Sequence, residues 1–149
     1  MFQVTMLLAD SAQVAEGKLY ILGGAWTLTG PGPVPAAIAA VIHVPWDQAN
    51  ADHTWRLELV DADGNPVIAA TPDGEEQPVA MEDGFKVGRP AEAKPGSRID
   101  YPIAINLPTG HPTAPGERYE WRMWIDGETR DEWRLPFATR PAQDLPERA

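Results

Sequence analysis

The chain has no cysteine among its 149 residues, so it can form neither disulfide bridges nor a reactive thiolate. It has only two serines, Ser11 and Ser97, and neither stands in the GxSxG turn that presents the nucleophile of many hydrolases. The Gly23-Gly24 pair lacks the spacing and the following helix of a phosphate-binding loop. The apolar run Val4–Ala9 is too short for a signal peptide or a membrane span, and no basic segment precedes it. We therefore expect a cytoplasmic protein.

Basic residues are also scarce. Twelve lysines and arginines stand against 22 acidic residues, which gives a formal net charge of −10. Nucleic acids and anionic membranes both require a basic surface, so the charge argues against either as a partner. Proline (16) and glycine (13) are frequent, which favours many short strands joined by turns over long helices. We expect a single domain over residues 1–140 and a polar C-terminal tail over residues 141–149.

The clearest pattern in the chain is the stretch Tyr119–Phe137, which holds three of the six tryptophans. Apolar and polar residues alternate in it, which predicts two half-buried strands on either side of the hairpin signal Asp126-Gly127. A strict two-residue turn would mix core and surface residues on one face. We therefore predict a three-residue loop with Gly127 as a left-handed bulge and Tyr119 opposite Trp133, or else a bulge within Thr129–Asp131.

Several further stretches show the alternation or apolar character of strands, at residues 4–8, 19–28, 36–44, 55–59, 67–70, 79–87 and 99–107. Asp10 or Ser11 can cap a short helical turn that Gly17 ends. Pro102 cannot donate a ladder hydrogen bond, so its strand is predicted at a sheet edge or bulged. Tyr119 follows Pro115-Gly116, as in the tyrosine corner of immunoglobulin-like domains. These features predict an all-β fold, an antiparallel, immunoglobulin-like β-sandwich of eight to nine short strands with one helical turn, and a closed barrel is the alternative.

Two of the predicted strands, Leu19–Leu28 and Ala36–Val44, are apolar on both faces. Strands of an antiparallel sandwich normally show one polar face. Either these strands lie mid-sheet with both faces covered, or their outer face meets another subunit. The second alternative predicts an interface made by Tyr20, Leu22, Ala37, Ala39 and Val41.

A different binding surface is suggested by tryptophans in polar surroundings. Trp46 lies in a predicted loop and Trp124 falls on the polar face of its strand, and such rings can stack on a sugar or anchor a protein contact. Asp47 and Asn50 would be the polar partners of these rings. Packing of both rings against neighbouring loops is the simpler interpretation.

The three histidines do not form a metal-binding motif. None of His43, His53 and His111 makes an HxH or HExxH pattern. If their strands paired, His43 and His53 could approach each other beside Asp47 or Asp52. Polar residues at a sheet rim explain the same pattern, so we expect neither metal nor cofactor.

Four segments together resemble a known family: LLADSAQVAEGKLYILGGAW (Leu7–Trp26), VPWDQAN (Val44–Asn50), RLELVDADG (Arg56–Gly64) and IDGETRDEWRLPF (Ile125–Phe137). They resemble small bacterial proteins described only as a domain of unknown function. The resemblance covers nearly the whole chain and implies a single soluble all-β domain. It implies no activity, cofactor or catalytic residue.

We therefore predict a non-enzymatic protein that acts through protein–protein contacts, as a homo-oligomer or as a subunit of a larger assembly. The first alternative is a small-molecule or carbohydrate-binding module that uses Trp46 and Trp124. The second is a metal-dependent enzyme that uses His43, His53 and Asp47.

Overall fold

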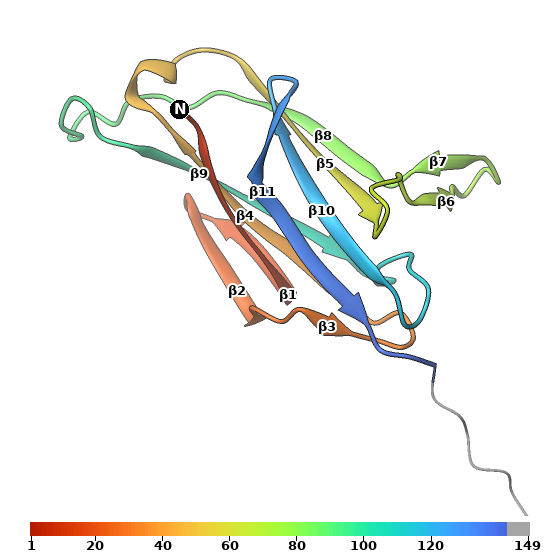
Figure 1. The fold of residues 1–149 in the computed structure, drawn as a ribbon. Helices are drawn as coiled ribbons and strands as arrows, with labels where there is room; N and C mark the ends of the chain where they lie inside the picture. The colour runs from red at the N-terminus through yellow and green to blue at the C-terminus, as the bar shows by residue number, and fades with distance from the viewer. Residues whose placement is uncertain (143–149) are drawn as a thin grey trace, which may run out of the picture.

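The computed structural model describes residues 1–142, and strands make up most of them (Figure 1). In chain order the strands are β1 (Gln3–Ala15), β2 (Lys18–Gly24), β3 (Leu28–Thr29), β4 (Ala36–Val44), β5 (His53–Asp61), β6 (Ile68–Ala70), β7 (Glu76–Pro78), β8 (Ala80–Phe85), β9 (Ile99–Leu107), β10 (Arg118–Ile125) and β11 (Glu128–Thr139). One 3₁₀ turn, η1 (Trp46–Gln48), follows β4. The predicted all-β class is confirmed. Among the described residues no helix has the length and hydropathy that would let it span a membrane.

Two larger sheets face each other. The first has the order β2-β1-β4-β9 and the second the order β3-β11-β10-β5-β8, while β6 and β7 form a small hairpin that projects from the body (Figure 1). All pairings are antiparallel except that of β3 with β11. The inner faces of both sheets supply one core, with fully buried Leu8 and Ile38 from the first sheet and Leu57 and Trp121 from the second. Alternating inward apolar residues therefore unite the two sheets into one packed body.

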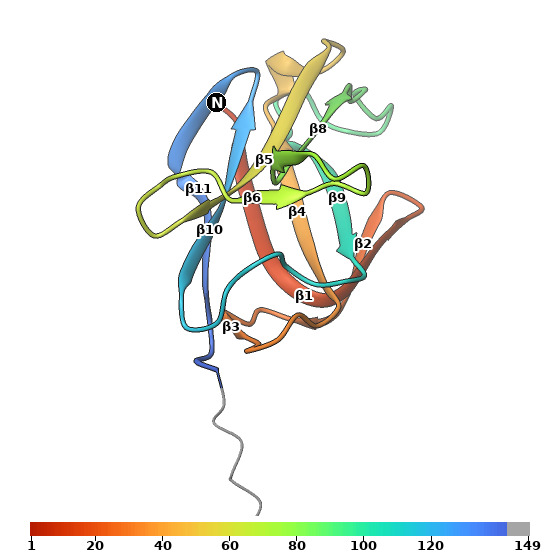
Figure 2. The same ribbon diagram turned by 90° about the vertical axis from the view of Figure 1, so that its right-hand side faces the viewer.

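The alanine-rich part of the outer face of the first sheet is covered by the chain itself. β1 pairs with β4 through residues 3–9 and with β2 through residues 9–15, and it curves strongly between the two (Figure 2). The β1–β2 hairpin therefore folds over the outer face of β4, where Ala9, Ala12, Ala37 and Ala39 form a second buried cluster. Alanine is the residue that lets a hairpin approach a sheet so closely. Of the two alternatives for the doubly apolar β4, coverage within the subunit is the one observed.

An asparagine side chain fixes this hairpin to β9. The backbone N–H of Ala12 donates to Asn106 Oδ1 (3.2 Å), and Asn106 Nδ2 donates to the carbonyl oxygen of Ala12 (2.8 Å). The side-chain amide thus bonds the strand backbone as a neighbouring strand would. Because its N–H and C=O both turn toward Asn106, Ala12 does not exchange hydrogen bonds with Ile21, its register partner on β2.

The helical turn predicted after Asp10 is wrong. β1 continues as a strand to Ala15, and Glu16 and Gly17 make the turn into β2 with φ values of 53° and 71°. The burial of Ala12 against β4 overrides the local capping signal. The predicted strand Leu19–Leu28 is also too long, because β2 ends at Gly24. Gly23 adopts a φ of +63°, and a Cβ at this position would collide with the Asp10 carboxylate.

The hairpin between β10 and β11 differs from the predicted loop. Asp126 and Gly127 form a two-residue turn with φ values of 51° and 80°, as a type I′ turn requires, so the three-residue loop is wrong. Tyr119 faces Phe137 and not Trp133. The alternative prediction, a bulge within Thr129–Asp131, is confirmed in part. The register shifts between the Trp124–Thr129 pair and the Arg122–Arg134 pair, so the bulged segment of β11 extends beyond Asp131.

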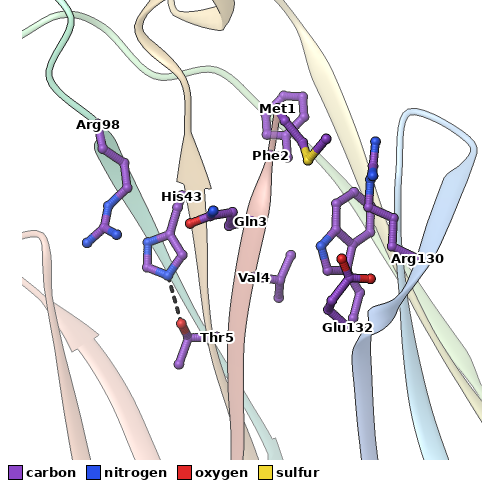
Figure 3. Close-up of a pocket in the computed structure, with 10 residues that line it drawn as sticks. Met1, Phe2, Gln3, Val4, Thr5, His43, Arg98, Arg130 and Glu132 are labelled. Carbon is purple, nitrogen blue, oxygen red and sulfur yellow. Dashed lines mark hydrogen bonds between the residues drawn. The ribbon is translucent and has the colours of Figure 1, made fainter.

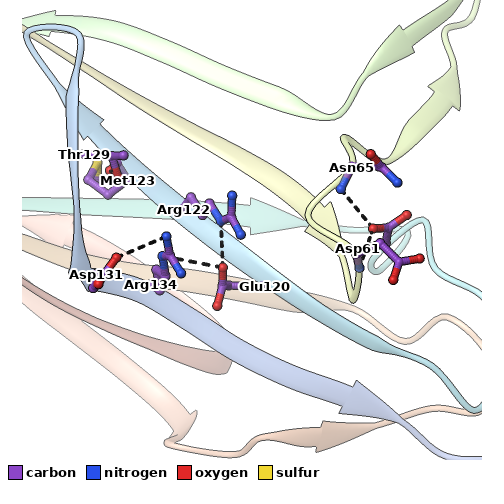
Figure 4. Close-up of polar contacts among 9 residues, drawn as sticks. Asp61, Asn65, Glu120, Arg122, Met123, Thr129, Asp131 and Arg134 are labelled. Atoms are coloured by element: carbon purple, nitrogen blue, oxygen red, sulfur yellow. Dashed lines mark hydrogen bonds and ion pairs between the residues drawn. The ribbon is translucent and has the colours of Figure 1, made fainter.

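A threonine stabilises this bulge. Met123 has no register partner on β11, and its carbonyl oxygen accepts a hydrogen bond from Thr129 Oγ1 (2.7 Å; Figure 4). The extra residues of β11 return Trp133, Leu135 and Phe137 to the core, where all three are buried. The alternation of apolar residues therefore outweighs a regular ladder, and the bulge absorbs the mismatch.

Two local predictions are confirmed. β9, which contains Pro102, is the edge strand of the first sheet. The hydroxyl of Tyr119 accepts a hydrogen bond from the backbone N–H of Ala114 (2.8 Å), the contact that defines a tyrosine corner. Of the predicted polar tail at residues 141–149, the part from residue 143 onward lies outside the described residues.

Replacement of the Tyr119 hydroxyl tests this corner. We expect Tyr119→Phe to lower the free energy of unfolding by about 1 kcal/mol, because the ring still fills its site while the bond to Ala114 is lost. Urea denaturation monitored by tryptophan fluorescence measures the change. An unchanged midpoint would show that water replaces the hydroxyl without cost.

Candidate functional site

A line of polar side chains crosses three strands on the outer face of the first sheet. Thr5 Oγ1 lies 2.7 Å from His43 Nε2, and His43 Nδ1 lies 2.7 Å from Asp100 Oδ1. Arg98 Nε contacts the same Asp100 oxygen at 2.9 Å. The strand register produces this order, because His43 on β4 stands directly opposite Asp100 on β9. The line borders an open pocket of about 340 Å³ that Arg130 of the opposite sheet also lines (Figure 3).

The hydrogen-bond partners determine which ring nitrogen of neutral His43 carries the proton, and they lower the pKa of Asp100. An ionised carboxylate only accepts, so neutral His43 carries its proton on Nδ1 and accepts the Thr5 hydroxyl proton at Nε2. Burial alone would raise the pKa of Asp100, but its hydrogen bonds to His43 and Arg98 outweigh burial and leave that pKa below its usual value.

The order hydroxyl, imidazole, carboxylate matches that of hydrolase triads. Acyl transfer also requires donors placed where an oxyanion develops. The two cations at the pocket already have partners, since Arg98 is paired with Asp100 and the Arg130 guanidinium lies 5.6 Å from the centroid of the Trp133 ring. With both cations engaged, the polar line forms a hydrogen-bonded network that joins β1, β4 and β9.

A second histidine, which is itself buried, forms an ion pair with an exposed aspartate at the end of the molecule where β10 turns into β11. His53 Nδ1 lies 2.7 Å from Asp126 Oδ2, and His53 Nε2 lies 2.8 Å from the carbonyl oxygen of Gln48. Both partners are acceptors, so both ring nitrogens must donate and the ring is an imidazolium. Burial lowers the pKa of His53, but the bonds to Gln48 and Asp126 and the negative charges of Asp126 and Asp52 outweigh it and raise that pKa above its usual value.

The third histidine has the opposite environment. His111 is buried and accepts a hydrogen bond at Nε2 from Trp121 Nε1 (3.1 Å). The rings of Trp26 and Phe137 pack against it. Burial lowers the pKa of His111 to about 4, so this ring is neutral at physiological pH.

The residues of the predicted aromatic site lie at one end of the molecule but in separate surroundings. Trp46 begins the η1 turn, and its ring is covered by the Arg89 guanidinium at 4.6 Å from the ring centroid. Asp47 and Asn50 are exposed beside it. Trp124 is half-buried on the outer face of the second sheet. No aromatic contact joins the two rings in the part of the chain that the structure describes.

The histidines proposed as metal ligands also lie apart. His43 faces outward on the first sheet, whereas His53 is enclosed between Asp126 and Gln48. Within residues 1–142 no group of three His, Asp or Glu side chains lies close enough together to hold a metal ion.

The outer face of the second sheet is charged. Glu120 accepts a 2.7 Å hydrogen bond from Arg122 and lies 3.8 Å from Arg134, which also contacts Asp131 at 3.3 Å (Figure 4). Arg56 lies near both Glu58 and Glu82. Such alternating charges are typical of a solvated sheet face, and each pair contributes little stability.

Several exposed apolar side chains lie together on the β1–β2 hairpin. Leu22 is 71% exposed and Tyr20 is 51% exposed, and together with Ser11 and Gln13 they border a shallow groove of about 370 Å³. Of the other residues in the predicted interface, Val41 is half-buried, and Ala37 and Ala39 are buried beneath the hairpin. An interface on this face therefore depends on Tyr20 and Leu22.

The polar line also contains residues that we did not predict from the sequence. The sequence does not single out Thr5, Arg98 and Asp100, because no local pattern in the chain places β1 and β9 on either side of β4. The alternation of β1 and β9 does assign Thr5 and Asp100 to an outer face. The missing information was the strand order.

Comparison with known proteins gives a family match over most of the chain. Residues 4–138 match the sequence model of a family described as "Family of unknown function (DUF6941)". No curated protein and no solved structure matches the chain.

Neutralising the partner of His53 tests the ion pair. The pKa of His53 is raised on folding, so the stability it contributes is present below about pH 6.5 and is lost as the pH rises through the raised pKa. We expect Asp126→Asn, which keeps the left-handed turn residue, to lower this pKa and to cost about 1–2 kcal/mol at pH 6. Titration of His53 by NMR and urea denaturation at pH 6 and 9 measure both effects. An unchanged His53 pKa in the variant would contradict the ion pair.

His111 predicts the opposite pH dependence. The pKa of His111 is about 4 in the folded protein, whereas the ordinary value for a histidine in the unfolded chain is 6.5. The unfolded chain therefore takes up the proton first as the pH falls. We expect this residue to cost up to about 3 kcal/mol of stability between pH 7 and pH 4. His111→Gln keeps an acceptor for Trp121 and should remove this part of the acid dependence. Parallel stability curves for the two proteins would contradict the prediction.

Proposed function

The chain belongs to the DUF6941 family of unknown function, and we propose that it is a non-enzymatic protein that acts as a homo-oligomer, through protein–protein contacts made by the β1–β2 hairpin. The observation that carries the proposal is the exposure of Tyr20 and Leu22 on a strand at the end of its sheet. Aromatic and large aliphatic residues that remain exposed together mark contact surfaces. The contact surface is the hairpin face that carries Tyr20 and Leu22.

The charge distribution of the molecule supports the same surface. The chain carries a formal charge of −10, and the outer face of the second sheet is covered with charged pairs. β2 has a single charged residue, Lys18. Another acidic copy, or any partner, therefore meets the least electrostatic opposition at this hairpin.

Two finer proposals accompany this function. We propose an immunoglobulin-like arrangement of the two sheets, which the tyrosine corner at Tyr119 supports. We propose a cytoplasmic location, which the lack of cysteine supports. The alternative of a carbohydrate-binding module is less well supported, because Arg89 already covers one face of the Trp46 ring that would stack on a sugar.

The solution mass tests the proposal. We expect the wild-type protein to have a mass above that of the 16.3 kDa chain in light scattering across a dilution series. Leu22→Lys should shift it to the monomer mass, because a buried lysine at the contact would lose its hydration.

A matched control separates the hairpin from general surface hydrophobicity. Ile68 on β6 is 51% exposed, as Tyr20 is, but it lies on the projecting β6–β7 hairpin. Ile68→Lys should leave the mass unchanged. A wild-type protein that stays monomeric at every concentration would contradict the proposed function.

A further inference from the structure

The outer edge of β2 has unpaired backbone groups, and the residues that direct these groups to solvent can be deduced. Within residues 1–142, β2 is the last strand of its sheet and pairs with β1 alone. Ala12 gives its N–H and C=O to Asn106 and so exchanges no bonds with Ile21. In such an antiparallel pair both residues direct their backbone groups away from each other. The N–H and C=O of Ile21 therefore point to the free edge, and those of Leu19 do the same by alternation.

This edge lacks the features that normally prevent strand pairing. Sheet edges are blunted by proline, by inward-facing charges or by very short strands. β2 has seven residues, no proline and one charge, at its first residue, Lys18. The other edge of the same sheet, β9, contains Pro102 and Asp100. The two edges therefore differ in the way expected if only β2 is used for pairing.

We infer that β2 pairs with β2 of a second copy of this chain, antiparallel and about a two-fold axis through Ile21. The inference rests on the proposed function and specifies its partner. It joins the two β2-β1-β4-β9 sheets of the two copies into one continuous sheet. A closed two-fold pair uses the β2 edges of both copies and leaves no β2 edge for further growth.

The register follows from the length of the strand and its side chains. Ile21 is the central residue of Lys18–Gly24, so an axis there centres the pairing on residues 20–22, the extended part of the strand that precedes the left-handed Gly23. Ile21 then exchanges two backbone hydrogen bonds with Ile21 of the second copy. Tyr20 stands opposite Leu22 of the second copy, twice, and these aromatic–aliphatic pairs cover the most exposed apolar residues of the hairpin.

Charge complementarity favours a second copy as the occupant. Antiparallel pairing places Lys18 opposite Gly24 of the second copy, next to Gly23. The Asp10 carboxylate packs over Gly23 in each copy, close to the free edge. Neither Lys18 nor Asp10 forms an ion pair within residues 1–142. The two-fold axis therefore brings two pairs of opposite charges together, although the chains as a whole repel each other.

The absence of cysteine makes the axis directly testable by single-cysteine cross-linking. We expect Ile21→Cys to form a disulfide-linked dimer under mild oxidation, since residues paired at about 5.5 Å between Cα atoms fall within disulfide range. Tyr20→Cys and Leu22→Cys should each give little cross-linked dimer alone. An equimolar mixture of those two variants should give the cross-linked heterodimer. Ile68→Cys is the exposed control that should not cross-link.

Charge reversal tests the second part of the inference. We expect Lys18→Asp and Asp10→Lys each to raise the dimer dissociation constant about tenfold, and the double variant to restore it. Asp10→Lys discriminates well, because it reduces the net negative charge and would tighten any association limited only by general repulsion. Asp10→Asn gives the same direction without a longer side chain, and Lys94→Asp is the control for net charge.

The outcomes separate this inference from the proposed function. A wild-type dimer that Leu22→Lys disrupts, with no Ile21→Cys cross-link, would overturn the two-fold pairing and leave the contact surface standing. Cross-linking of Tyr20→Cys alone would overturn the register. A wild-type monomer at all concentrations would overturn both. Cross-linking at Ile21 together with restoration by the double charge variant would establish the dimer.

Discussion

The structure depends on the contact between the β1–β2 hairpin and the alanine face of β4. β4 is the central strand of its sheet and apolar on both sides, so one side would face water if nothing covered it. Ala37 and Ala39 allow the backbone of the hairpin to come close, and Asn106 holds the hairpin through two hydrogen bonds to Ala12. The curvature of β1, the position of β2 and the edge it presents all follow from this contact.

The three histidines show how partners decide the state of one residue type. His53 is held between a carboxylate and a carbonyl oxygen, so it must be charged. His111 accepts a bond from an indole within an aromatic cluster, so it must be neutral. His43 lies between a hydroxyl and a carboxylate, and neutral His43 has only one tautomer that satisfies both. Stability therefore has opposite pH dependences at the two ends of the molecule.

Sequence alternation predicted most of the strands, because a side-chain period of two is a local property of the chain. The positions of Tyr119 and Pro102 could also be predicted, since a tyrosine corner and an edge proline are local signals. The helical turn after Asp10 failed because burial of Ala12 against a distant strand outweighed the capping signal. The polar line from Thr5 to Asp100 was not predictable, because His43 meets residues 38 and 57 positions away only through the strand order.

The same curvature that buries β4 also determines which edge of the sheet stays open. If β1 were straight, Ala12 would not reach Asn106 on β9, and the alanine face of β4 would remain uncovered. With β1 curved, β2 lies over its own sheet, and its far edge points to solvent with the backbone groups of Ile21 unpaired. The hairpin that covers β4 within one subunit therefore also presents the free edge of β2 at the surface of that subunit. The intramolecular and intermolecular roles of the hairpin are two consequences of one bend.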